Sequence, residues 1–253
     1  MTSDELEKFQ CERRLRASQY NQDSYFRDLS QRWLKESMKR KYVYNFDWLG
    51  RPIIQYPQDA MAVQELIWSV KPDLIIETGI AHGGSLILSA SMLALLDVAP
   101  NAANFKRRVL GIDIEIREHN RQLIEQHPLS FMIEMVESSS TCEISFEKIK
   151  SYANNFNKVM VFLDSMHTEE HVLKELDMYA DLVSTDSYCV VFDTFVENLD
   201  EDIFPDRPWS KGDNPMTAIA KFLKKRDDFE IDKKIESKLM ITVAPNGFLK
   251  KSS

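Results

Sequence analysis

The sequence predicts an α/β protein: a doubly wound, Rossmann-type, mostly parallel seven-stranded sheet with helices on both faces and an N-terminal helical extension. Short apolar runs, typical of buried parallel strands, alternate with segments of about ten residues that have helical periodicity. The first apolar run is followed directly by a glycine-rich segment. A chain of 253 residues, 43% of them hydrophobic, suits one such domain better than two.

The N-terminal part differs in composition from the rest of the chain. Residues 4–40 are rich in Glu, Lys, Arg and Gln with apolar residues interspersed, which predicts one or two amphipathic helices. These helices are expected to cap the domain or to contact a second copy in a homo-oligomer. We assign residues 1–58 to this extension and its connecting segment, and residues 59–253 to the Rossmann-type domain. Asp59 is expected to cap the first helix of that domain.

The remaining elements follow in regular alternation. Strands are expected at residues 74–76, 109–113, 132–136, 159–163, 188–192, 229–231 and 240–243. Helices are expected between them, at residues 86–96, 117–126, 143–154, 169–180 and 216–225. In such a sheet, ligands bind outside the carboxyl ends of the strands, near the point where the strand order reverses.

Composition excludes several classes of partner. The net charge of −8 and a pI near 5.3 argue against nucleic acid, because phosphate contacts need clustered Lys and Arg. No stretch approaches the roughly 18 apolar residues that span a bilayer, and the start of the chain is polar and acidic. Three widely separated cysteines form neither a metal-type pair nor a disulfide framework. We therefore expect a cytoplasmic protein without a membrane partner.

The glycine-rich segment Glu77–Ser85 follows the first strand. Its glycines, Gly79, Gly83 and Gly84, let the backbone turn tightly and approach a ligand. Ser85 is placed to cap the next helix, whose N-terminal amides would face an anionic group. The spacing matches neither G-x-G-x-x-G nor the phosphate-binding P-loop, which disfavours NAD and ATP.

Two acidic residues narrow the choice of ligand. Glu77, directly before the loop, suits a ligand with an ammonium group, and Asp113, at the end of the second strand, can accept both hydroxyls of a ribose. An amino-acid end plus a ribose describes S-adenosylmethionine, the predicted cofactor. His82 would shape the loop, contact this cofactor or face solvent, while Ser138 and Ser139 would lie beside the adenine or cap the next helix. In the alternative interpretation, Glu77 is a salt-bridge partner and the glycines only turn the chain.

Two further acids leave neighbouring strand ends. Asp164 follows the fourth strand and Asp193 the fifth, and carboxylate oxygens are the ligands that Mg²⁺ prefers. Thr194 is a further candidate metal ligand. Asp164 is also a candidate for contact with the cofactor and for catalysis. His167 could act as the general base, since its unperturbed pKa is near neutrality. Alternatively, the two aspartates cap helices and His167 is hydrogen-bonded in the core.

Several spaced motifs together resemble the cephalosporin hydroxylase family. They lie at residues 48–53, 57–59, 77–85, 111–113, 164–168 and 193–194, and the resemblance extends from about residue 44 to 243. Despite its name, that family is similar to magnesium-assisted, S-adenosylmethionine-dependent O-methyltransferases. The resemblance implies cofactor-binding roles for Glu77, Gly79, Ser85 and Asp113, and metal-binding roles for Asp164 and Asp193.

The chain departs from this family at two positions. Phe192 stands where members often have a second acid, and Met166 stands where related sugar O-methyltransferases have an acidic base. The metal would then have fewer protein ligands, or another residue such as Glu197 or Asn198 would complete its coordination. His167 becomes the leading candidate for the base.

The predicted function is O-methylation of a small hydroxylated molecule, a sugar or a phenolic natural-product intermediate. The long aromatic and proline-rich loop at residues 195–215 is expected to cover this acceptor. One alternative is a protein that binds the cofactor without turnover. Another is a hydroxylase, as the family name suggests, although the chain lacks an obvious His-x-Asp…His iron triad.

Overall fold

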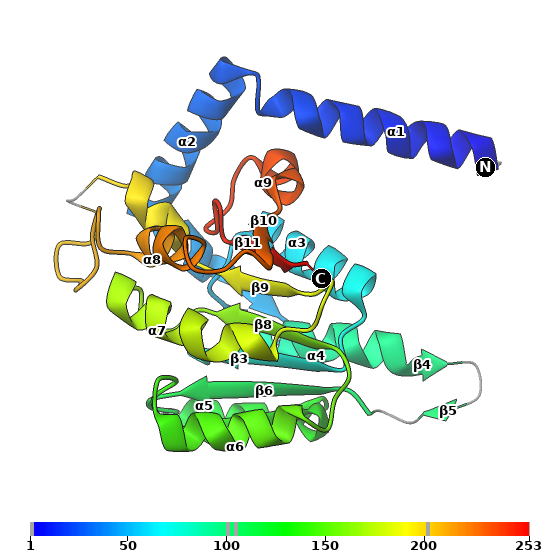
Figure 1. Ribbon diagram of the computed structural model, residues 1–253, viewed down its shortest axis with the longest axis vertical. Helices are drawn as coiled ribbons and strands as arrows, with labels where there is room; N and C mark the ends of the chain where they lie inside the picture. Colours follow the sequence, from blue (N-terminus) through cyan, green and yellow to red (C-terminus); the bar gives the residue numbers. More distant parts are fainter. Residues whose placement is uncertain (1–2, 100–101, 104–105, 201–202, 253) are drawn as a thin grey trace.

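The computed structural model describes residues 3–99, 102–103, 106–200 and 203–252 and has a seven-stranded sheet at its centre (Figure 1). The strand order is β10-β11-β9-β8-β3-β6-β7, and β11 alone runs antiparallel to the other six strands. The strands are β3 (Leu74–Thr78), β6 (Arg108–Asp113), β7 (Ile133–Glu137), β8 (Val159–Leu163), β9 (Tyr188–Val191), β10 (Phe229–Ile231) and β11 (Phe248–Lys251). The predicted fold class is confirmed.

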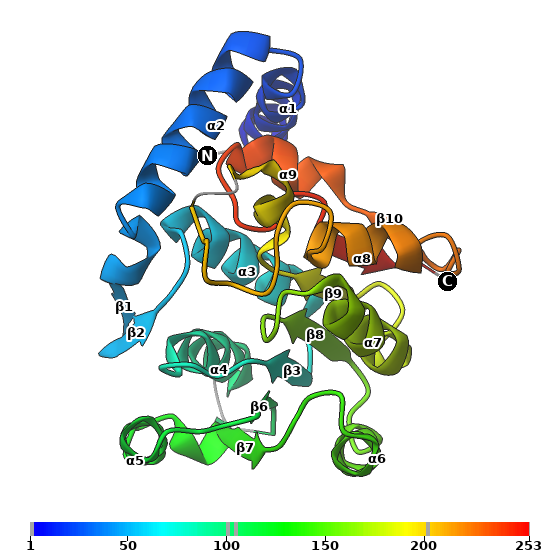
Figure 2. The same cartoon turned by 90° about the vertical axis from the view of Figure 1, so that its left-hand side faces the viewer.

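Helices cover both faces of this sheet (Figure 2). One face carries α3 (Pro57–Val70), α4 (Gly84–Asp97) and α5 (Glu118–Glu125). The other carries α6 (Glu143–Ala153), α7 (Glu169–Tyr179) and α8 (Pro215–Phe222). Successive strand residues point to opposite faces, so Ile75 and Met160 belong to one hydrophobic core and Ile76 and Val161 to the other. The chain therefore needs nearly continuous apolar runs in its central strands, as the sequence has.

The extension consists of two helices, α1 (Ser3–Tyr20) and α2 (Ser24–Lys39), and α2 begins where the Asp23 side chain accepts a hydrogen bond from the amide of Phe26. Helix α1 projects from the body and packs against α9 (Lys233–Leu239) (Figure 1). The shorter elements are η1 (Tyr42–Asn45), β1 (Phe46–Trp48), β2 (Arg51–Ile53), β4 (Val98–Ala99), β5 (Ala102–Ala103), η2 (Ser130–Met132), η3 (Ala180–Leu182) and η4 (Thr194–Asn198).

Two local predictions are wrong. Residues 240–243 do not form a strand, and β11 takes the expected place beside β9. Asp59 does not cap α3, because Pro57 occupies the first helical position and Tyr56 is the N-cap. Asp59 lies in the first turn and is fully buried, so the domain boundary predicted before it falls inside a helix.

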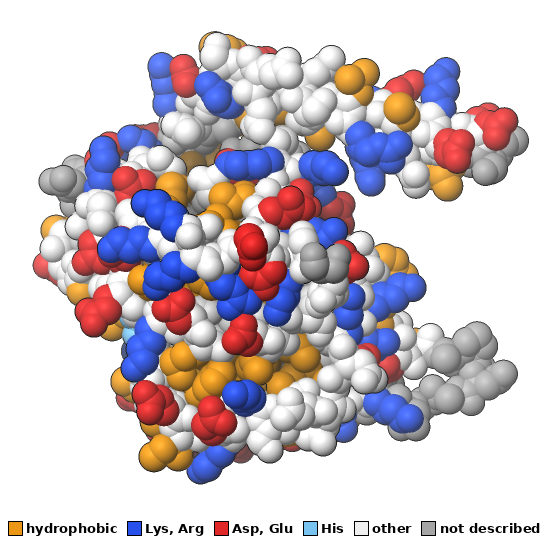
Figure 3. Space-filling model, viewed as in Figure 1, with side chains coloured by type: hydrophobic (Ala, Val, Ile, Leu, Met, Phe, Trp, Pro, Cys, Tyr) orange, Lys and Arg blue, Asp and Glu red, His pale blue; other side chains and the backbone are white. Residues whose placement is uncertain are grey.

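The surface carries charges of both signs. Figure 3 shows basic and acidic side chains intermixed over the visible face of the α/β body. Within the described ranges, no helix is long and apolar enough to cross a membrane.

Candidate functional site

Asp164 and Asp193 lie side by side because the strands before them are paired. Leu163 at the end of β8 is in register with Val191 of β9, and the backbone amide of Phe192 donates to the carbonyl of Leu163 at 2.9 Å. Both aspartates therefore emerge at the carboxyl edge of the sheet. Neither side chain caps a helix through a hydrogen bond, so the capping alternative does not apply.

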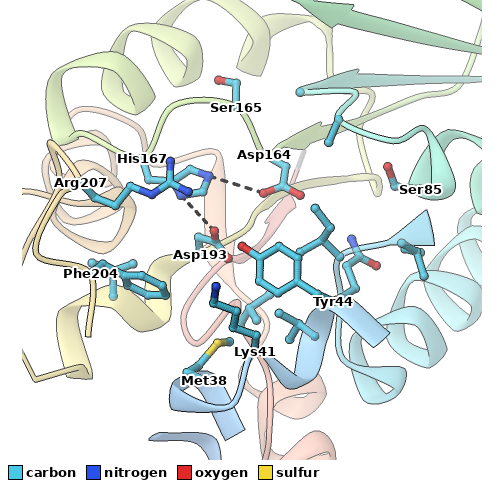
Figure 4. A pocket seen from close by; sticks show the side chains of 18 of the residues that line it. Met38, Lys41, Tyr44, Ser85, Asp164, Ser165, His167, Asp193, Phe204 and Arg207 are labelled. Atoms are coloured by element: carbon cyan, nitrogen blue, oxygen red, sulfur yellow. Dashed lines mark ion pairs between the residues drawn. The ribbon is translucent and has the colours of Figure 1, made fainter. Parts of the chain in front are cut away.

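His167 completes a cluster with these two acids. Its Nδ1 lies 3.0 Å from Oδ2 of Asp193, and its Nε2 lies 3.7 Å from Oδ1 of Asp164 (Figure 4). Among the described residues, neither ring nitrogen has a hydrogen-bond partner, although both are buried. One potential ligand atom from each of the three residues lies within 4.8 Å of the other two, close enough for one cation to contact all three.

Electrostatics also favour a cation at this cluster. Burial raises the pKa of Asp164 well above its usual value, and repulsion from Asp193 raises it further, as do the more distant Glu77 and Glu175. The Trp209 ring lies against the imidazole of His167, with centroids 4.7 Å apart. A positive charge between the two carboxylates would offset their repulsion.

Thr194, by contrast, is directed elsewhere. Its hydroxyl donates to the carbonyl of Pro245 at 2.6 Å and is fully buried. The expectation that Thr194 supplies a metal ligand is therefore not supported. Glu197 is also engaged, because its carboxylate accepts hydrogen bonds from Gly212 and Asn214.

The glycine-rich loop is shaped by packing with other parts of the protein. A Cβ on Gly79 would lie 2.1 Å from the carbonyl oxygen of Asp164, and one on Gly84 would lie 2.3 Å from that of Pro52. Gly83, at φ +83°, is the N-cap of α4. These glycines let β2 and the end of β8 approach the loop, a role additional to ligand access.

Asp113 fixes the position of this loop. One of its carboxylate oxygens accepts hydrogen bonds from the amides of Ile80 at 2.8 Å and Ala81 at 3.3 Å, and the other accepts from the amide of Glu115. Arg51, which the sequence reasoning missed, donates to the carbonyl of His82 and so holds the loop from the opposite side.

Glu77 lies beneath the loop with one oxygen unsatisfied. The Ser85 hydroxyl donates to Oε1 of Glu77, so Ser85 lies inside α4 and does not cap it. Oε2 is buried and has no hydrogen-bond partner in the described structure. Burial raises the pKa of Glu77 to about 7, against the opposing effect of the Ser85 hydrogen bond. Such an oxygen is ready to accept a hydrogen bond from a cationic ligand.

A cavity of about 780 Å³ joins the loop to the cluster. Besides the loop and the cluster, it is lined by residues 38–44 and by residues 203–209 (Figure 4). Its volume is typical of small-molecule sites. The structure thus places Phe204 and Trp209, from the long aromatic loop, against this pocket.

Ser138 and Ser139 lie farther along the same edge. The Ser138 hydroxyl accepts a hydrogen bond from Ser145, and the Ser139 hydroxyl pairs with Thr141. Neither they, nor Asp113, nor Glu77 lines this pocket, so the contacts of these four residues with the cofactor stay a prediction.

Sequence reasoning missed the role of Asp59. One of its carboxylate oxygens accepts from the Thr242 hydroxyl and the other from the amide of Val243. The carbonyl of Val243 in turn accepts from the amide of Phe195, two residues after Asp193. Asp59 therefore supports the segment that presents Asp193. No local signal distinguishes such an acid from a helix cap.

Comparison with known proteins identifies the family of this chain. The family description "Rhamnosyl O-methyltransferase/CmcI" matches residues 40–252. The chain belongs to this family. A rhamnosyl O-methyltransferase of Mycobacterium bovis is 30% identical over 193 residues, covering 76% of this chain and 72% of the relative. One of Mycobacterium leprae is 28% identical over 223 residues, covering 85% and 90%.

Solved structures of the rhamnosyl O-methyltransferase/CmcI family share the fold. An apo structure of CmcI has a TM-score of 0.56 at 15% identity, covering 83% of this chain and 77% of that one. A CmcI structure with S-adenosylhomocysteine has a TM-score of 0.55, also at 15% identity, covering 82% and 83%. The resemblance to the cephalosporin hydroxylase family is confirmed.

Proposed function

We propose that this protein transfers a methyl group from S-adenosylmethionine to a hydroxyl of a sugar or related natural product, with a divalent cation. One observation carries the proposal: the buried polar atoms without a hydrogen-bond partner in the described structure include Oε2 of Glu77 and both ring nitrogens of His167. The glutamate oxygen suits the ammonium of the cofactor, and the imidazole nitrogens suit a metal ion. The named relatives methylate rhamnosyl groups, which supports a sugar acceptor.

The cofactor would lie along the glycine-rich loop. Glu77 would accept its ammonium, and the loop from Gly79 to Ser85, with His82, would contact its methionine end. Asp113 already accepts amide hydrogen bonds, but a carboxylate has about four acceptor sites and retains capacity for ribose hydroxyls. Solved CmcI structures, which share the fold, hold S-adenosylhomocysteine or Mg and S-adenosylmethionine, which supports a cofactor of this class.

Asp164, Asp193 and His167 would hold the cation, most simply Mg²⁺. When bound, it would lower the pKa of the substrate hydroxyl and stabilise the negative charge that develops there. Phe192, which replaces an acid of the family pattern, packs its ring against Phe162 in the core. Protein ligation would therefore come from three side chains.

His167 is thereby assigned a role different from the predicted base. Its Nε2 lies near Asp164 and its Nδ1 near Asp193, so one of these nitrogens can bind a cation that the carboxylates also hold. His167→Ala should reduce turnover about a hundredfold or more. If His167 is a ligand, raising the Mg²⁺ concentration restores part of the rate; if it is the base, added metal restores nothing.

Calorimetry and a transfer assay test the function. The dissociation constant of S-adenosylhomocysteine should lie roughly in the micromolar to millimolar range that is typical of enzyme substrates. Methyl transfer to a rhamnosyl glycoside, detected by mass spectrometry, should require Mg²⁺. Absence of cofactor binding with and without Mg²⁺ would contradict the proposal. Binding without transfer to any hydroxylated acceptor would favour a protein that has lost turnover.

The hydroxylase alternative receives less support from the cluster. Iron oxygenases of the facial-triad type use two histidines and one carboxylate, whereas this cluster has one histidine and two carboxylates. Oxygen consumption that depends on Fe²⁺ and 2-oxoglutarate would revive it.

The N-terminal helices supply a further proposal, a homo-oligomer contact. Leu6, Phe9 and Leu15 of α1 and Leu29 of α2 are all about half exposed, at 46–58%. Covering these side chains would remove apolar surface from water. Light scattering of the full chain and of a Leu6→Ser/Phe9→Ser/Leu15→Ser variant should show a lower mass for the variant; equal monomer masses would exclude the contact.

A further inference from the structure

Two basic side chains face the pocket from different walls. Lys41 follows α2, and Arg207 belongs to the loop at residues 203–209 (Figure 4). In the part of the chain that the structure describes, neither forms an ion pair with a carboxylate. Lys35, by comparison, lies 2.7 Å from a carboxylate oxygen of Asp200.

Arg207 is held beside the metal-type cluster. Its guanidinium lies 5.1 Å from the centre of the Trp209 ring, a cation–π distance, and that ring packs against His167. In Figure 4, Ser85 of the cofactor loop lies on the other side of the cluster. The positive charge of Arg207 is therefore at the end of the pocket away from the loop.

The charges lining the pocket do not balance without a ligand. Its acids are Asp164, Asp193 and Asp206, and its bases other than histidine are Lys41 and Arg207. A divalent cation would balance the first two acids. The two bases then exceed Asp206 by one positive charge, which attracts an anion into the pocket.

We propose that the methyl acceptor carries an anionic group, a carboxylate or a phosphate, and that Lys41 and Arg207 bind it. This inference rests on the proposed methyltransferase function and names its acceptor class. Arg207 offers a planar fork to two oxygens, and Lys41 offers a single ammonium. Held by its charge at this end, the acceptor places a neighbouring hydroxyl beside Asp164 and Asp193.

Matched sugars test this acceptor class. Calorimetry with protein saturated with S-adenosylhomocysteine and Mg²⁺ compares D-glucose, D-glucuronate and α-D-glucose 1-phosphate, and the corresponding three compounds of galactose. At least one anionic compound should bind about tenfold more tightly than its neutral partner, with the preference decreasing as salt is added. Comparing the uronate with the sugar 1-phosphate shows whether a carboxylate or a phosphate is preferred. Equal binding within every set would overturn the inference.

Substitutions then assign the preference to the two side chains. Lys41→Gln and Arg207→Gln should each reduce it about five- to tenfold, and Arg207→Lys should retain part of it. One control is Lys71→Gln, at the end of α3, because Lys71 shares with Lys41 a backbone in the left-handed region but lies outside this pocket. The other is Lys211→Gln, which lies in the longer segment 195–215 with Arg207 but does not line the pocket. Both controls should bind as the wild type does.

Three results separate the possible failures. If Lys41→Gln weakens S-adenosylhomocysteine binding instead, the lysine serves the cofactor and the inference is overturned. If the variants match their controls, it is overturned as well. If the wild type binds no S-adenosylhomocysteine, the proposed function fails, and the inference fails with it.

Discussion

Two sets of acids, the fully buried Asp59 and the partly exposed Asp164 and Asp193, differ in how fully their carboxylate oxygens are hydrogen-bonded. Asp59 has both oxygens engaged, by Thr242 and by the amide of Val243. Asp164 and Asp193 have no side-chain hydrogen bond in the described structure, and they face His167, whose nitrogens are unpartnered. A saturated acid holds the fold together, whereas an unsaturated cluster awaits a ligand. Substitution should therefore affect the two sets in opposite ways.

The largest expected effect is on catalysis. Asp164→Asn and Asp193→Asn should each reduce methyl transfer about a thousandfold, by analogy with the loss of a principal charge-stabilising group. In chelator, the same variants should unfold at the wild-type temperature or higher, because a repulsive charge has been removed. Rates and thermal unfolding measured together test this. Retained activity combined with a lower unfolding temperature would mean that the cluster is structural.

Asp59→Asn should show the reverse pattern. Asparagine offers one acceptor oxygen where two donors point, so a buried donor is left unpaired, at a cost of about 1–3 kcal/mol in the free energy of unfolding. Denaturant unfolding measures this cost. Asp47→Asn, at an exposed acid, is the control and should change stability by less than about 0.5 kcal/mol. A variant as stable as this control would remove Asp59 from the supporting role.

The pH dependence of stability and of cofactor affinity tests the role of Glu77. Its pKa is raised to about 7 by burial, whereas an unfolded chain releases this proton near its ordinary value of 4.5. Between these values the unfolded state binds fewer protons, so the wild type should lose stability relative to Glu77→Gln as pH rises from 4 to 7. Cofactor affinity should rise over the upper part of this range, because the ionised form accepts the ammonium.

Unfolding and calorimetric titrations across this pH range measure the two slopes. Asp59, whose burial also raises its pKa to about 7, contributes a stability slope of the same sign. The Glu77→Gln variant retains that part, so only the difference between the two proteins reports on Glu77. Parallel curves for the two proteins would contradict the assignment.

Local sequence predicts the parts of this molecule that local physics determines. Apolar runs locate the central strands, and the strand ends bring Asp164 next to Asp193, because parallel pairing leaves little choice. The sequence misplaces the last strand because residues 240–243 form a more apolar run than β11, whose last two residues are lysines. Pairing with β9 and β10, and the hydrogen bonds to Asp59, select between them. Those partners are distant in sequence, so no local pattern reveals them.

The candidate site likewise contains residues that local sequence predicts and residues that it does not. Glu77 and the glycines are recognisable from their position at the end of a strand, whereas Lys41 and Arg207 line the same pocket only because distant parts of the chain fold around it. Thr194 shows the opposite error, since its position beside Asp193 says nothing of the direction of its hydroxyl, which donates to Pro245. Proximity in sequence predicts which residues share an edge, and tertiary packing decides which of their atoms remain free.

The smallest expected effect tests this rule on the cofactor side. Ser85→Ala removes the donor to Oε1 of Glu77, leaving a second buried oxygen without a partner and raising the pKa of Glu77 further. The dissociation constant of S-adenosylhomocysteine should increase about three- to tenfold, the range expected for one hydrogen bond. Ser91→Ala, on the same helix but bonded to Leu88 and Trp48, should leave it unchanged. Equal affinities would mean that Ser85 only packs, and that an unpartnered oxygen on Glu77 is by itself no sign of a cofactor site.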